Sequence, residues 1–279
     1  MRKSIIGIII LSIILAGMII PIGFSGQTNP VVITYGETTY GNPTYKNTVD
    51  TFFKNQANID LATADVKVIN AAEVNKVSSS ITGKTYGSNQ IYSSALVDLN
   101  DNDNLEVTVD KSMITTITGD MYISALKSVG ITSGHVYVTS PVKATGESAL
   151  TGIMNSYEEA TNVEIPETVK DAANTEIFTE AEIVEKSNVS AEVLSKLVDD
   201  VKETVKAENI TDHQTIVNII TNYTIVNNIN ISSSDIEKLA DSIEQLQNIQ
   251  GDINSYESEV SSVLNSTDSG SGFLDGLFN

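Results

Sequence analysis

An Asx-rich segment between two strand-like runs is the part of the sequence best suited to holding a metal ion. It places carboxylate and amide oxygens at alternate positions, as calcium requires in an EF-hand loop. That loop also needs Gly at its sixth position and Glu at its twelfth, where this chain has Asp103 and Val109. Asn and Asp are also common in hairpin turns, which is the alternative. The candidate calcium ligands are Asp98, Asn100, Asn102 and Asp103.

A Gly-Glu-Ser segment could supply a nucleophile or an anion-binding helix terminus. Ser148 follows Gly146 as in the G-x-S-x-G nucleophile elbow, but Leu150 stands where the elbow needs its second Gly. Gly and Ser also favour the start of a helix, whose free backbone amides can bind an anion. Gly146, Glu147 and Ser148 are therefore candidate binding residues, and the packing of a helix start is the alternative explanation.

Acidic and histidine side chains give no clear catalytic pattern. A hydrolase acting on glycans would need paired carboxylates, and Glu147, Glu158 and Glu159 are candidates by location only. His135 and His213 are far apart in sequence, so we expect surface or edge residues with no metal or catalytic role. Cysteine is absent, which excludes disulfides and thiolate sites. Apart from calcium, we expect no cofactor.

The charge balance restricts the partners. The chain of 279 residues has 36 acidic and 16 basic residues, a formal charge of −20. This charge repels phosphate backbones and anionic lipids, so we expect no nucleic-acid partner. It also favours solubility.

The amino-terminal segment has the layout of an export signal. Arg2 and Lys3 precede an apolar run that ends near Pro21, and small residues near Ser25 suit cleavage. Residues 1–25 are therefore predicted to be a signal peptide or, if uncleaved, an amino-terminal membrane anchor. Either alternative places the chain from residue 30 on outside the cytoplasmic membrane.

Within residues 30–160, segments whose apolar residues recur with the spacing of a strand alternate with segments that have the spacing of a helix. This order predicts an α+β domain with a small mixed or antiparallel sheet and packed helices. The runs 91–99 and 105–109 are expected to form a hairpin, and residues 78–89 a loop. Strands are expected at 31–35, 65–69, 91–99, 105–109 and 135–139, and helices at 44–55, 120–129 and 147–160.

After Thr161 the apolar residues recur only with the spacing of a helix. This pattern predicts a helical carboxy-terminal region at 166–265, and a flexible tail is expected at 266–279. Capping boxes are expected at Thr211 and Ser234, and Gly251 is expected to bend or split the last helix. We expect two packing units that meet near 162–166, although the helices could instead form an outer layer of the sheet. The apolar stripe Leu194, Leu197, Val201 and Val205 should contact Ile216, Ile219, Ile220, Leu239 and Ile243.

Residues 112–158 closely resemble the signature of a family of uncharacterised exported proteins from bacteria and archaea, domain of unknown function 1002. Thr34-Tyr35-Gly36 and Ser93-Ser94-Ala95 also fall where the family has similar residues. Val129 and Thr139-Ser140 depart from it, in places where members often have Ala. The resemblance implies an exported protein with an α+β front and a helical rear, and it supplies no mechanism. The matching residues are Ile114-Thr115, Thr118, Met121-Tyr122, Ala125-Leu126, Gly130-Ile131, Val136, Val138, Pro141, Gly146 and Ala149-Leu150-Thr151-Gly152.

These observations favour an extracellular or cell-surface protein with a non-catalytic binding or structural role. The expected partner is an unidentified envelope component or protein, with membrane contact only through an uncleaved amino-terminal segment. The alternative is an extracellular hydrolase acting on cell-wall polymer or peptide.

Residues 149–152 are expected to open a helix packed on the strand at 135–139, with small side chains for close approach.

Overall fold

The computed structural model describes residues 29–100 and 104–275, and side chains as far as Leu264. The predicted signal segment 1–25 lies outside these ranges. Within them, no helix combines the length and apolar character that crossing a membrane would require.

Five strands form one mixed sheet in the order β2-β1-β3-β5-β4. β3 is antiparallel to both of its neighbours, whereas β2 pairs with β1, and β4 with β5, in parallel. The predicted α+β class with a small mixed sheet is confirmed. The strands are β1 (Val31–Gly36), β2 (Asp65–Ile69), β3 (Ser94–Asp98), β4 (Leu105–Val109) and β5 (Gly134–Thr139).

The predicted hairpin between β3 and β4 is wrong, because β5 lies between these two strands. The central residues of β5 are buried, whereas β4 is only partly covered. A strand that is apolar on both faces gains most in the middle of a sheet, which places β5 inside and β4 at the edge.

The predicted loop at 78–89 is also partly wrong, since α3 (Ala71–Ile81) extends into it. Asn70 and Glu73 cap this helix with a capping box, and Val74 and Val77 are buried.

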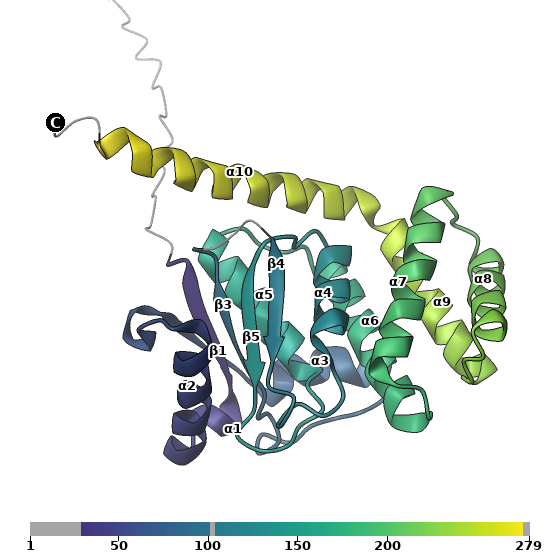
Figure 1. The fold of residues 1–279 in the computed structure, drawn as a ribbon, viewed down its shortest axis with the longest axis horizontal. Coiled ribbons are helices and arrows are strands. Elements are labelled where there is room, and N and C mark those ends of the chain that lie inside the picture. Colours follow the sequence, from purple (N-terminus) through teal and green to yellow (C-terminus); the bar gives the residue numbers. More distant parts are fainter. Residues whose placement is uncertain (1–28, 101–103, 276–279) are drawn as a thin grey trace, which may run out of the picture.

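Helices cover both faces of the sheet (Figure 1). α2 (Pro43–Ala57) packs on one face through Val49 and Phe53. On the other face α5 (Ser148–Thr161) lies over β1 and β3. A Cβ at Gly152 would come within 3.0 Å of Thr34 Cγ2 on β1, which confirms that a small residue permits close approach. The strand approached is β1, however, and not the expected β5.

The carboxy-terminal half is helical, as predicted. Gly251 lies next to the junction of α9 and α10, which confirms the expected break. α10 continues to Asp275, within the segment 266–279 for which we expected a tail. The helices not yet given are α1 (Glu37–Tyr40), α4 (Gly119–Ser128), α6 (Glu167–Lys186), α7 (Ala191–Ala207), α8 (His213–Val226), α9 (Ser233–Asn248) and α10 (Gln250–Asp275), with a 3-10 turn at Leu61–Thr63.

Two of the predicted helix caps are displaced by one or two residues. Asp212, not Thr211, caps α8 by accepting from the backbone N–H of Thr215. Ser232, not Ser234, caps α9 in a capping box with Asp235. The capping pattern is short and recurs by chance in a chain this rich in Ser, Thr and Asx.

The apolar interior of the described residues forms three clusters: one between α2 and the sheet face it covers, and two larger ones that we call the front core and the rear core. The front core joins one face of the sheet to α3–α6 and to part of α9 and α10. The rear core joins α7, α8 and α9, and it contains the predicted stripe with its predicted partners. α6 contacts both, through Ile177 and Phe178 in the front core and Ile183 in the rear core. The two cores therefore share α6, and a division of the chain into two units near 162–166 stays a prediction.

Candidate functional site

A polar cluster lies where α4, α6 and α7 meet, and we call it the junction cluster. Its members are Ser124 and Ser128 on α4, Glu176 on α6, and Asp199 and Lys202 on α7. Lys202 Nζ donates to Glu176 Oε1 at 2.7 Å, to Ser124 Oγ at 2.5 Å and to Ser128 Oγ at 2.8 Å. All three ammonium protons of this lysine are thereby used.

The ammonium group at the centre of the cluster is held in its charged form. The Lys202 side chain is 15% exposed. Burial by itself lowers its pKa, but the charge and hydrogen bond of Glu176, with Glu180 and Asp199, raise the pKa above its ordinary value. Lys202 therefore acts as a fixed cation rather than as a proton acceptor.

Ser124 stands between two acids and this cation. Its Oγ lies 2.5 Å from Asp199 Oδ1 and 3.0 Å from Glu176 Oε1. Because a hydroxyl has one proton, it donates to one carboxylate at a time while accepting from Lys202. The hydroxyl is thus positioned by three charged groups.

Glu180, one helical turn after Glu176 on α6, is the most deeply buried acid near the cluster. Burial and then the charge of Glu176 raise the pKa of the Glu180 carboxyl well above its ordinary value. Among the described residues, no hydrogen-bond partner reaches either of its carboxyl oxygens. Such surroundings favour the protonated form of a carboxyl group.

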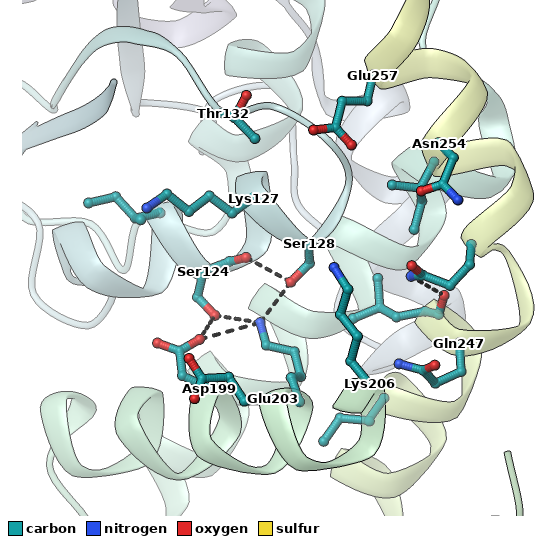
Figure 2. A pocket seen from close by; sticks show the side chains of 16 residues that line it. Ser124, Lys127, Ser128, Thr132, Asp199, Glu203, Lys206, Gln247, Asn254 and Glu257 are labelled. Carbon is teal, nitrogen blue, oxygen red and sulfur yellow. Dashed lines mark hydrogen bonds and ion pairs between the residues drawn. The ribbon is translucent and has the colours of Figure 1, made fainter. Parts of the chain in front are cut away.

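A pocket of about 440 Å³ opens above the junction cluster. Figure 2 shows Ser124 and Ser128 of α4 on one side, with Asp199, Glu203 and Lys206 of α7 below them. α10 closes the opposite side with Asn254 and Glu257. We call this space the junction pocket. It is lined by Ile123, Ser124, Lys127, Ser128, Thr132, Asp199, Lys202, Glu203, Lys206, Ile243, Leu246, Gln247, Gln250, Ile253, Asn254 and Glu257.

A close contact with a glycine turn fixes the position of α10 beside the pocket. Gly130 has φ +85°, and a Cβ on it would lie 3.2 Å from Glu257 Cβ. Ile253 and Tyr256 of α10 are buried in the front core. The wall formed by α10 is therefore packed against the body of the protein.

The predicted Gly146-Glu147-Ser148 segment lies at the start of α5, apart from the residues that line the junction pocket. Gly146 has φ +111°, and a Cβ on it would lie 2.7 Å from Ile114 Cγ2. Glu147 is 2% exposed, and Tyr86 donates to its Oε1 at 2.7 Å. An anion at this helix terminus would meet the charge of Glu147, so the geometry favours the packing explanation.

Part of the predicted calcium loop lies outside the described residues, including Asn102 and Asp103. Asp98 ends β3, and its Oδ1 accepts from the backbone N–H of Asn100 at 2.9 Å and from Asn100 Nδ2 at 2.8 Å. This is the Asx-turn arrangement considered as the alternative. The calcium site stays a prediction.

The three glutamates proposed for a hydrolase do not converge. Glu158 contacts Lys170 at 3.2 Å, and Glu159 contacts Lys67 at 2.5 Å, whereas Glu147 is bound to Tyr86. None of them lines the junction pocket.

Sequence reasoning missed the junction cluster. All five members lie in segments that the sequence analysis expected to be helical, 120–129 and the region 166–265, but no pattern in the sequence indicated that these segments meet. One signal was available: Ile177, Phe178 and Ala181 surround Glu176 and Glu180 with apolar residues, so that no face of this segment is purely polar.

Comparison with known proteins gives a family but no activity. A family described as "Protein of unknown function (DUF1002)" matches residues 35–263. Uncharacterized protein YpuA of Bacillus subtilis (strain 168) is 32% identical over 149 residues, which are 53% of this chain and 50% of that relative. The aligned segment thus spans half of the relative's length. No solved structure matches the chain. Since the family match covers most of its length, the chain belongs to the DUF1002 family of proteins of unknown function.

Proposed function

We propose that this protein is exported and works at the cell surface as a non-catalytic binding protein, with the junction pocket as its binding site. Export is supported by the signal layout of residues 1–25. The observation that carries the binding role is the pocket itself. It gathers Lys127, Lys202 and Lys206, three of the 16 basic residues of the chain, around one space of about 440 Å³.

The lining indicates the class of ligand. Three acids, Asp199, Glu203 and Glu257, face these three lysines, and the side-chain amides of α9 and α10 complete the rim. Apolar side chains such as Ile243 and Ile253 supply a nonpolar floor. A site with fixed charges of both signs and amide groups suits a short peptide, or the peptide part of a cell-wall polymer.

A binding experiment with matched variants tests this proposal. Soluble peptide and glycan fragments of isolated cell envelope are fractionated and titrated into the purified protein, with calorimetric detection. Lys206→Gln and Glu257→Gln change exposed residues of the rim, so each should weaken binding without loss of folding. Lys54→Gln, an exposed control on α2, should bind as the unchanged protein does. Equal binding by all variants would exclude the pocket.

Export has its own test. Added protease should digest the region from residue 30 on in intact wall-less cells, while a cytosolic marker protein stays protected. Protection of the whole chain together with the marker would contradict export.

A hydrolase is the second candidate, and one observation favours it. Ser124 Oγ lies 2.5 Å from Lys202 Nζ, the pairing that Ser-Lys hydrolases use. In this state the ion pair with Glu176 holds the lysine charged, so it cannot take the proton from the serine. Cleavage of envelope fragments that disappears in Ser124→Ala, with binding retained, would support the hydrolase over the binding protein.

A further inference from the structure

A second group of polar side chains lies on the helical rear, apart from the residues that line the junction pocket. His213, the first residue of α8, faces three acids of α9: Glu237, Asp241 and Glu244. α8 packs along α9, and this contact brings the ring to the acidic face of α9.

The distances differ on the two sides of the imidazole ring. Nε2 lies 3.0 Å from Glu237 Oε2. Nδ1 lies 2.9 Å from Glu244 Oε2 and 3.6 Å from Asp241 Oδ1. The shorter contacts are within hydrogen-bond range, but 3.6 Å is too long for a hydrogen bond. A proton on Nδ1 would therefore form a hydrogen bond with Glu244 and leave Asp241 without a direct hydrogen bond to the ring.

A metal ion accounts for both distances on the Nδ1 side. Ligands about 2.1 Å from one tetrahedral ion lie about 3.4 Å from each other, close to the separations seen. The ligand atoms of His213, Asp241 and Glu244 all lie within 4.8 Å of one another. We propose that these three residues bind a divalent transition-metal ion of the zinc class, with solvent completing its coordination.

The contact at Nε2 is what a metal-bound histidine needs. Such a histidine usually donates its other ring N–H to a carboxylate, which fixes the tautomer and orients the ring. Glu237 occupies that position, so it is a positioning residue and Nδ1 is free to bind the ion. One nitrogen with two carboxylates suits zinc better than calcium, which takes six to eight oxygens.

Charge gives a further reason for a cation at this place. Glu237, Asp241 and Glu244 lie on one face of α9 at helical spacing, where like charges repel one another. Asp212 adds a fourth acid beside His213, and Lys238 of α9 contacts Glu182 of α6 instead. An ion bridging the two helices would relieve this repulsion and fasten α8 to α9.

Metal titration of the full-length protein tests the proposal. Zn²⁺ should bind at a single class of site and raise the melting temperature, and Ca²⁺ should not displace it from that site. His213→Gln and Asp241→Asn should each weaken Zn²⁺ binding at least about tenfold, and Glu237→Gln about ten- to a hundredfold. His135→Gln, at the other histidine, is the matched control and should bind Zn²⁺ normally.

A spectroscopic readout on the unchanged protein keeps the test independent of variant folding. Co²⁺ should give the visible absorption of a tetrahedral or five-coordinate nitrogen–oxygen site, and Zn²⁺ should abolish it by competition. Circular dichroism checks that the His213→Gln variant keeps its helices. Absence of Zn²⁺ binding, or equal binding by His135→Gln and His213→Gln, would overturn the proposal and leave a protonated imidazole between carboxylates.

Discussion

The front core and the rear core bury different kinds of side chain. The rear core is aliphatic, and His213 with the acids that face it lies partly or fully exposed beside it. The front core borders buried polar groups such as Glu147, Glu176 and Glu180. α6 contributes to both cores and carries two of these three acids. Buried charge requires a compensating partner, and α7 supplies it as Lys202. The contact of the two cores is therefore the place where this protein concentrates its polar chemistry.

The largest expected effect comes from separating the two regions at Pro166. Truncation there removes α6, α9 and α10, which contribute buried apolar residues to the front core. We expect the fragment 29–166 to lack a cooperative thermal transition, because the apolar surfaces of α3, α4 and α5 would be uncovered. A calorimetric scan of the fragment measures this. A cooperative transition would show that the units separate at 162–166 after all.

The next effect concerns the cation between the two cores. Lys202→Met leaves Glu176 buried without its ion-pair partner, and we expect a loss of about 3–5 kcal/mol in the free energy of unfolding. Lys196→Met, in an exposed pair with Asp200 on the same helix, is the control and should change little. Urea unfolding measures both. If both variants lost equally little free energy of unfolding, the ion pair of Lys202 with Glu176 would not stabilise the contact of the two cores.

The pH dependence of stability gives a smaller effect. Because the pKa of Glu180 is raised in the folded state, its contribution to stability is complete below the ordinary glutamate pKa. That contribution is lost as the pH rises through the raised value. Glu180→Gln cannot ionise, so its free energy of unfolding should fall less steeply as the pH rises above the ordinary glutamate pKa. The control variant Glu192→Gln, at an exposed position on α7, should show the same pH dependence of the free energy of unfolding as the unchanged protein. Identical slopes for the unchanged protein and Glu180→Gln would contradict a buried proton.

The two regions also differed in what their sequences predicted. Leu194, Leu197, Val201 and Val205 recur on one face of a helix, and a local period of this kind determines which side is buried. The rear core could therefore be predicted from the sequence. Strand order in the front depends on contacts between distant segments. The apolar character of β5 favours an inner position, but it does not indicate which two strands β5 lies between.

The candidate site was harder to predict for a physical reason. Sequence patterns identify buried positions by apolar residues, whereas Glu176 and Glu180 are buried and polar. The burial of Glu176 is tolerable because Lys202, 26 residues further along the chain, reaches it across the helix contact. A contact between residues that are distant in the sequence produces no periodic pattern from which it could be predicted. By contrast, the histidine cluster needs only the packing of α8 on α9, yet a lone His gave no reason to look for partners.

Photo-crosslinking from the wall of the junction pocket tests the central claim most directly. A photoreactive amino acid replaces Asn254, which lines the pocket, or the neighbouring Ser255, which is exposed but does not line it. After irradiation with isolated cell envelope, position 254 should yield an adduct containing an envelope peptide, weakened by Lys206→Gln. Position 255 should yield little. Adducts of equal yield at both positions, or none at position 254, would contradict a binding site between α4, α7, α9 and α10.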